Sequence, residues 1–181
     1  MVRTMRTVRE LICWEYAKLI AGSAVGNRKN YNFVVTVFNR LMAGQISVSS
    51  VLRENKQLFM AGEECAYCGA KHGLQWEHII PKTAGGPDTM DNLVRACASC
   101  NQTKACLDPY QWYESRGAIN GIPRIVLGKF LKLVLAEYER LGVLDSEEYM
   151  RERNVCRVTL SQVFRRESDG SADCGFDGQS K

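Results

Sequence analysis

The sequence predicts an α+β protein in which a small, loop-rich module lies between two mainly helical segments. Apolar residues recur at helical spacing over the first 60 residues and again after residue 108. Between residues 65 and 104, short segments rich in Cys, Gly, Asn and Pro replace that pattern and contain four of the eight cysteines. The chain therefore divides into four expected parts: residues 1–62, mainly helical; 63–117, the module; 118–167, mainly helical; and 168–181, a polar, Gly-rich tail expected to be disordered.

The first 62 residues are expected to form three helices. Thr7-Val-Arg-Glu10 has the form of a capping box, in which the Thr hydroxyl and the Glu carboxylate satisfy backbone N–H groups at a helix start. Apolar side chains follow at helical spacing as far as Ile20, and glycines then break the pattern. A second apolar segment spans residues 31–42 and a third spans 49–60, each followed shortly by a glycine.

Four further helices are expected toward the C-terminus. Asp108 followed by Pro109 is typical of a helix start, with Asp as the N-cap and Pro at the first helical position. The longest helix is expected over residues 125–141, and its apolar face could pack internally or form a dimer. Asp145-Ser-Glu-Glu148 has the form of another capping box, and residues 159–162 begin a last short helix.

The composition is that of a globular protein with a packed core, since 45% of the residues are apolar and 24% are charged. No apolar run approaches the roughly 20 residues that span a bilayer, so no membrane partner is expected. Glu10, Glu15 and Lys18 interrupt the N-terminal segment, which therefore lacks the apolar core of a signal peptide. We expect a cytoplasmic protein.

The net charge of +4 is unevenly distributed along the chain. Residues 1–60 carry nine Lys/Arg against three Asp/Glu, a surplus of +6, whereas residues 61–107 (four against five) and 108–181 (eleven against twelve) each come to −1. A basic N-terminal third suits a polyanionic partner such as nucleic acid. Ordinary solvated helix faces would carry the same charges, and charge alone does not separate the two interpretations.

Two C-x-x-C pairs, Cys65-Ala-Tyr-Cys68 and Cys97-Ala-Ser-Cys100, are separated by 28 residues. Each pair can direct two thiolates at one tetrahedral ion, so together they predict a closed four-cysteine Zn²⁺ site. Such a site has no open coordination position, so its role would be structural, in a segment with too few apolar residues for a core of its own. The alternatives are four buried free thiols or a redox-active pair.

Several further elements follow in a fixed order around these pairs. They are an acid-His-Ile-Ile-Pro run from Glu77 to Pro81, a Gly-Gly turn, Asn92-Leu93, Asn101 directly after the last cysteine, and Lys104. Together with the cysteines, this ordered set resembles the HNH endonuclease family over about residues 65–105. The resemblance implies a ββα-metal module, in which two strands and a helix hold a catalytic divalent cation.

The resemblance also implies a role for each matched residue. His78 would be the general base that takes a proton from water, since imidazole titrates near neutral pH. Glu77 and Asn101 would hold Mg²⁺ or Mn²⁺, which prefer oxygen ligands. Asn92 would steady the loop and the imidazole, and Lys104 could contact phosphate. Neighbouring residues on a strand point to opposite faces, so Glu77 and His78 can share a site only if the strand bends there.

Two departures from the family pattern concern the cation. The acid is usually Asp and here is Glu77, which is longer by one methylene, and the third signature position is Asn101 in place of the His of the name-giving members. The identity of the catalytic metal therefore stays open. Without these surroundings, His78 would be interpreted as a core histidine, Asn92 as a loop residue and Lys104 as a solvated helix residue.

Basic residues in and beside the module could bind nucleic acid along its phosphates. Those singled out are Arg3, Arg6 and Arg9 along one helix side, Arg28 and Lys29 in a basic loop, and Lys82 after the Ile-Ile-Pro run. The function expected is a metal-dependent DNA endonuclease that makes restriction-type cuts in double-stranded DNA, with a homodimer as the simplest way to cut both strands. The alternatives are a nuclease that nicks one strand or acts on RNA, and a non-catalytic zinc-ribbon module that binds nucleic acid.

Overall fold

The structure is a computed structural model that describes residues 4–47 and 62–165. The predicted helix over residues 49–60, the tail 168–181 and Arg3 lie outside the described residues. Helices and a two-stranded sheet follow one another in the order α1 (Val8–Ala24), α2 (Tyr31–Met42), β1 (Leu74–His78), β2 (Leu93–Cys97), α4 (Ala98–Lys104), α5 (Pro109–Ser115), α6 (Arg124–Arg140) and α7 (Glu147–Glu152). Short 3-10 helices intervene: η2 (Lys82–Ala84), η3 (Met90–Asn92), η4 (Ile119–Gly121) and η5 (Arg157–Phe164). The predicted α+β class is confirmed.

Thr7 and Asp108 cap helices at the starts that the sequence predicts. The Thr7 hydroxyl accepts a hydrogen bond from the Glu10 N–H at 3.2 Å, and Asp108 starts α5 with a complete capping box. The prediction for α7 is wrong by one residue, because Ser146 and not Asp145 is the N-cap. Asp145 instead accepts two hydrogen bonds from the Arg9 guanidinium, at 2.6 and 2.9 Å.

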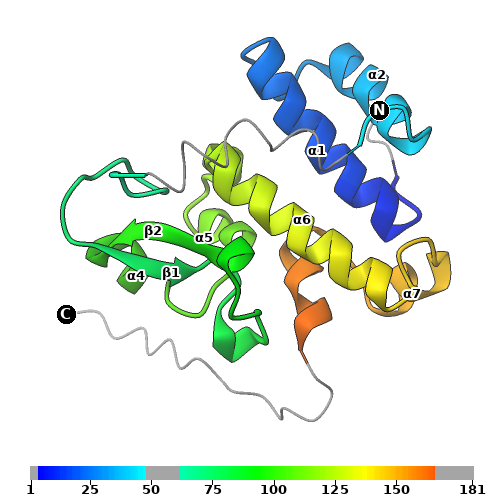
Figure 1. The fold of residues 1–181 in the computed structure, drawn as a ribbon. Coiled ribbons are helices and arrows are strands. Elements are labelled where there is room, and N and C mark those ends of the chain that lie inside the picture. The colour runs from blue at the N-terminus through cyan, green and yellow to red at the C-terminus, as the bar shows by residue number, and fades with distance from the viewer. Residues whose placement is uncertain (1–3, 48–61, 166–181) are drawn as a thin grey trace.

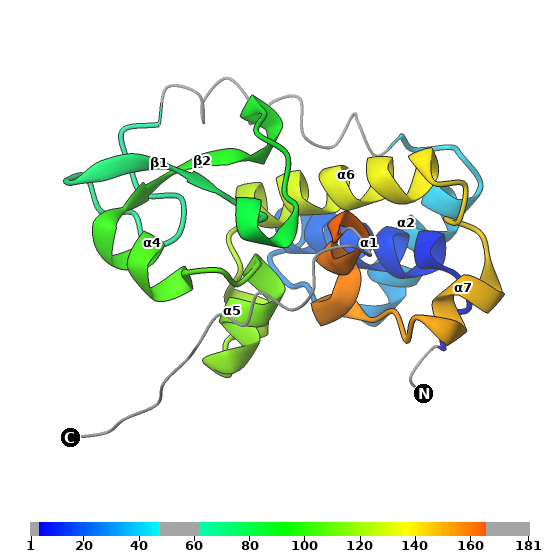
Figure 2. The ribbon, with the colours of Figure 1, turned by 90° about the horizontal axis from the view of Figure 1, so that it is seen from below.

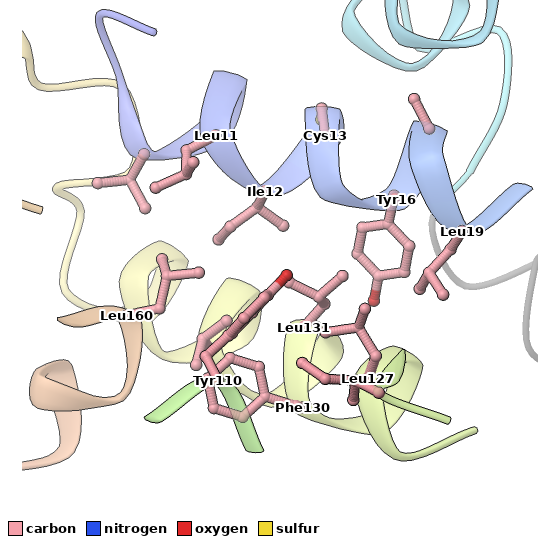
Figure 3. Packing of buried hydrophobic residues seen from close by; sticks show 14 of the residues in the cluster. Leu11, Ile12, Cys13, Tyr16, Leu19, Tyr110, Leu127, Phe130, Leu131 and Leu160 are labelled. Carbon is pink, nitrogen blue, oxygen red and sulfur yellow. The ribbon is translucent and has the colours of Figure 1, made fainter. Parts of the chain in front are cut away.

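The helical core lies between α1 and α6. In Figure 3, Ile12, Tyr16 and Leu19 of α1 point toward Leu127 and Leu131 of α6, and all five side chains are buried. This burial removes apolar surface from water on both helices, which stabilises their packing. The apolar face of α6 therefore packs within the chain. A homodimer stays a prediction.

A polar contact also lies inside this core. Glu15 of α1 is only 3% exposed. Its carboxylate accepts a hydrogen bond from the Tyr110 hydroxyl at 2.8 Å and forms an ion pair with the Lys18 amino group at 2.7 Å. Burying a carboxylate is costly unless it is paired in this way. The contact joins α5 to α1 across a sequence separation of 95 residues.

The sheet is an antiparallel hairpin whose second strand runs directly into α4, which gives the ββα arrangement that the resemblance implied. The hairpin lies beside one end of α6, away from α2, in both views (Figures 1 and 2). Lys129 of α6 donates hydrogen bonds to the backbone carbonyls of Met90 and Leu93, at 2.9 and 2.6 Å. Ile79 and Ile80, after β1, belong to the same buried apolar cluster as α1, so one core supports the module and its flanks.

No helix among residues 4–47 and 62–165 is long and apolar enough to cross a membrane.

Candidate metal centre and catalytic pocket

The four cysteines of the two C-x-x-C pairs come together at the base of the hairpin. Their sulfur atoms all lie within 4.8 Å of one another, and the Sγ atoms of Cys68 and Cys97 are 3.7 Å apart. Four thiolates bound at about 2.3 Å to a tetrahedral zinc ion would be about 3.8 Å apart, so the spacing fits zinc. It is far too long for a disulfide, whose sulfurs are about 2.05 Å apart.

Backbone hydrogen bonds favour the thiolate form, which a metal requires, at Cys65 of the first C-x-x-C pair (the first knuckle). Burial raises the pKa of Cys65, but backbone hydrogen bonds at Cys97, Cys68 and Tyr67 outweigh burial and lower its pKa to about 7. The Ala66 N–H also donates to the Arg95 carbonyl of β2 at 2.8 Å, which fixes the knuckle against the sheet. At Cys68, a backbone hydrogen bond at Ala70 lowers the pKa, but burial and the neighbouring Cys65 thiol outweigh it and raise the pKa. Burial also raises the pKa of Cys100, so among these three cysteines the thiolate is favoured at Cys65.

A cavity of about 250 Å³ opens beside the end of β1, and it contains the main predicted catalytic residues. His78, Asn101 and Glu77 all line it, together with Trp76, Pro81, Lys82, Thr83 and Ala105. The His78 side chain is 24% exposed, so it is reachable from solvent and is not the core histidine of the alternative interpretation. Strand β1 and helix α4 thus bring together residues that are 23 positions apart in the sequence.

Glu77 and His78 reach this cavity from opposite sides of β1. The Glu77 side chain points inward and is 5% exposed as a residue, whereas His78 is only partly buried. The strand ends at His78, and the chain then turns through Pro81 into η2. The chain bends at Ile79 and Ile80, directly after the strand, and Glu77 and His78 both border the cavity.

Lys104 corrects the sequence interpretation. It is 0% exposed, and its amino group lies 2.5 Å from the Glu77 Oε1 and 3.0 Å from the His78 carbonyl oxygen. A phosphate cannot reach a side chain in this position, so the predicted phosphate contact is replaced by a buried ion pair. Burial lowers the pKa of Lys104, and the Glu77 carboxylate opposes that effect by favouring the charged form.

Glu77 is held at its second oxygen as well. The Tyr67 hydroxyl donates a hydrogen bond to Oε2 at 2.7 Å, and burial raises the pKa of Tyr67, which keeps that hydroxyl protonated. Tyr67 lies inside the first C-x-x-C pair, and its ring packs edge-to-face on Trp112 of α5 at 5.2 Å between centroids. The acid beside His78 is thus fixed by a lysine from α4 and a tyrosine from the cysteine knuckle.

Asn92 fastens the loop that follows β1. Its side-chain oxygen accepts from the Ile80 N–H at 2.9 Å, and its amide nitrogen donates to the carbonyls of Ile80 and Pro87, at 2.8 and 2.9 Å. Gly86 lies against this clamp, since a Cβ atom there would be 2.0 Å from the Ile80 carbonyl oxygen. These three side-chain bonds of Asn92 go to the loop backbone and none goes to the imidazole.

Asp88 is a site residue that the sequence interpretation missed. The imidazole Nε2 of His78 lies 2.9 Å from its Oδ1, and the Lys82 amino group lies 2.6 Å from its Oδ2. The hydrogen bond from Lys82 has the largest effect and the one from His78 the next largest, and both lower the pKa of the Asp88 carboxyl. Asp88 follows Gly85-Gly86-Pro87 in the loop that Asn92 clamps over the strand end, and no spacing rule links it to His78.

Most of the basic residues proposed for nucleic acid have partners within the chain. Arg6 pairs with Glu147 at 3.0 Å, Arg9 pairs with Asp145, and Arg28 donates to the carbonyls of Asn120 and Ile122, at 3.2 and 2.9 Å. Exposed pairs of this kind contribute little to stability and can exchange partners, so nucleic-acid contact by Arg6 and Arg9 stays a prediction. Lys29 is exposed.

Comparison with known proteins agrees with the geometry of the module. Residues 65–105 match the family model described as HNH endonuclease. The chain is 24% identical over 156 residues to the CRISPR-associated endonuclease Cas9 of Actinomyces naeslundii, a match that covers 81% of the chain and 13% of that protein. It is 34% identical over 77 residues to the CRISPR-associated endonuclease Cas9 of Corynebacterium diphtheriae, covering 40% of the chain and 6% of that protein. The chain thus spans a small part of the length of these relatives. No solved structure matches the chain significantly.

Proposed function

Because residues 65–105 form an HNH endonuclease domain, we propose that the chain hydrolyses phosphodiester bonds of DNA, with His78 as the general base. One observation carries the proposal: the partly exposed imidazole of His78 and the side chain of Asn101 line one open cavity beside a hairpin with a zinc-type cysteine cluster. A base and an oxygen ligand on one cavity wall are what hydrolysis of a phosphodiester by water requires.

Asp88 supports the proposed role of His78 because it holds the Nε2 edge of the ring. When Nε2–H donates a hydrogen bond to the Asp88 carboxylate, the neutral imidazole has its lone pair on Nδ1, which can accept a proton from water. The carboxylate then also stabilises the imidazolium that forms. We assign Asp88 as a positioning residue and His78 as the catalytic base.

A hard divalent cation, Mg²⁺ or Mn²⁺, would find side-chain oxygen donors in the cavity wall at Glu77 and Asn101. The Asn101 side-chain oxygen and a Glu77 carboxylate oxygen would hold it, and when bound it would neutralise charge on the phosphate and the leaving oxygen. Each carboxylate oxygen has two lone pairs, so Glu77 retains acceptor capacity beyond its bonds to Lys104 and Tyr67. The adjacent Lys104 charge would weaken that ligand.

The ion pair between Glu77 and Lys104 is also the observation that favours the second candidate function, a module that binds nucleic acid without cutting it. The two are separated by incubating the zinc-loaded full chain with supercoiled plasmid in Mg²⁺, Mn²⁺ or Ca²⁺. We expect cleavage with at least one of the first two metals. Binding without cleavage in all three would favour the non-catalytic module.

The decisive variant is His78→Ala, compared with His72→Ala, which removes an exposed histidine of the turn before β1. We expect His78→Ala to lower cleavage by at least about 100-fold, the usual contribution of a positioned general base. Zinc content and the unfolding midpoint should stay unchanged. His78→Ala protein that cleaves at the parental rate would exclude His78 as the base.

The product of the parental chain separates the nuclease alternatives. Linear plasmid would support double-strand cutting by the proposed homodimer, whereas nicked circles or cleavage of RNA would favour the other nuclease alternatives.

A further inference from the structure

Trp76 is an exposed aromatic residue on the wall of the catalytic cavity. It precedes His78 by two positions on β1, so both side chains stand on the same face of the strand, with their Cα atoms about 6.8 Å apart. Trp76 is 46% exposed and lines the same cavity as His78 and Asn101. Tryptophan is usually buried to a high degree, and so much exposed ring beside a catalytic cavity suggests a binding role.

Arg95 lies directly opposite Trp76 on β2. The register pairs the two residues, and the guanidinium carbon lies 5.1 Å from the centre of the indole ring, in cation–π contact. Within residues 4–47 and 62–165, no carboxylate lies at ion-pair distance from Arg95. Its guanidinium thus retains N–H donors for an anion, while its stacking against Trp76 orders the indole.

We infer that Trp76 and Arg95 form a platform that holds an unpaired nucleotide beside the scissile phosphate. This inference rests on the proposed function. The indole would stack on the base, and Arg95 would bind the adjoining phosphate. In a paired duplex both faces of a base are covered by its neighbours, so stacking on Trp76 requires a base that has left the helix. The substrate is then a DNA strand that is locally single-stranded at the cut.

A purely structural pair would explain the same contact in a different way. Cross-strand pairs on an exposed sheet face stabilise a hairpin by about 0.2–1 kcal/mol, and they need no ligand. The two interpretations differ in what Trp76→Ala does to binding. A platform discriminates between unpaired and paired DNA, whereas a structural pair does not.

The experiment uses the full, zinc-loaded chain carrying His78→Ala, so that binding is measured without cleavage. Fluorescence anisotropy compares a labelled single strand, the fully paired duplex, and the same duplex with a short central bubble. The background protein is compared with added Trp76→Ala, Trp76→Phe and Arg95→Ala, and with Gln75→Ala as a matched control, since Gln75 is an exposed neighbour on the same strand.

The background protein should prefer the single strand and the bubble, and Trp76→Ala should weaken binding to both by about 5- to 150-fold, the range found for base–aromatic stacking. Binding to the paired duplex should change little, Trp76→Phe should retain most of the affinity, and Gln75→Ala should have no effect. Arg95→Ala should reduce the salt dependence of single-strand binding by about one phosphate contact. Equal loss on all three DNAs, or no loss on any, would overturn the platform.

Failure of the platform and failure of the proposed function give different results. If the parental chain cuts no nucleic acid but Trp76→Ala still removes the preference for unpaired DNA, the platform stands and the nuclease proposal fails. If the parental chain cuts paired and bubble duplexes at equal rates and Trp76→Ala leaves that ratio unchanged, the nuclease stands and the platform fails.

Discussion

The buried pair of Lys104 and Glu77 allows a quantitative test of how the module is held together. Lys104→Met keeps the volume and removes the charge, which leaves the Glu77 carboxylate 5% exposed with only the Tyr67 hydroxyl as a partner. Removing one member of a buried ion pair costs about 3–5 kcal/mol, because the remaining charge is desolvated and uncompensated. Glu77→Gln should cost a similar amount, since it leaves the fully buried ammonium of Lys104 without its counter-charge.

The double variant should be much less destabilised than the sum of the two single variants. With Lys104→Met and Glu77→Gln combined, no unpaired charge is buried, and the neutral amide can still accept the Tyr67 hydrogen bond. We expect an interaction free energy of at least about 2 kcal/mol. Urea unfolding of the zinc-loaded chain, followed by tryptophan fluorescence, measures it, provided that all four proteins unfold with the same denaturant dependence.

The control for this cycle is the exposed pair of Lys82 and Asp88, whose side chains are 55% and 66% exposed. Lys82→Met should change the unfolding free energy by less than about 1 kcal/mol, because exposed ion pairs are screened by water. If Lys104→Met were as mild as Lys82→Met, or if the two buried substitutions were additive within about 0.5 kcal/mol, Lys104 would not be a buried partner of Glu77.

Two further substitutions test the other supports of the pocket. Cys97→Ser should lose the bound zinc and the hydrogen-exchange protection of residues 65–105, because three ligands do not close the site. Cys156→Ser removes an exposed cysteine outside the cluster and should change neither. Pure folded parental protein without zinc would contradict the assignment. Gly86→Ala should destabilise the chain by about 1–3 kcal/mol, because its Cβ would lie 2.0 Å from the Ile80 carbonyl oxygen, which also accepts a hydrogen bond from the Asn92 amide. Gly121→Ala, whose nearest new contact is 3.7 Å, is the control, and equal stability of the two variants would refute this reasoning.

Features that depend on residues close together in the chain could be predicted from the sequence. The bounds of α2 match the apolar segment 31–42, because Asn30 caps one end and a glycine follows the other. The cysteine cluster could be predicted because two C-x-x-C pairs leave few other ways to satisfy four thiols in a loop-rich segment. The hairpin followed by a helix came from the resemblance, and the structure has the same order of elements.

Features that depend on contacts between distant residues could not be predicted in this way. Lys104 is a basic residue at the C-terminal end of the short helix α4, and nothing in its neighbours indicates that it would be buried against Glu77, 27 residues earlier. Arg9 has the spacing of a phosphate-binding residue, but its guanidinium donates hydrogen bonds to Asp145, which lies 136 residues away in the sequence. In both cases the partner is a carboxylate brought close by tertiary packing, which no local pattern encodes.

The zinc-type cluster and the catalytic pocket are parts of one hydrogen-bonded unit. Tyr67 comes from the first cysteine knuckle and binds one Glu77 oxygen, while Lys104 comes from α4, which begins at the second knuckle, and binds the other oxygen and the His78 carbonyl. The four cysteines therefore fix both groups that hold the end of β1. A zinc ion bound by all four thiolates would in this way set the place of the His78 imidazole, the proposed base, without touching substrate.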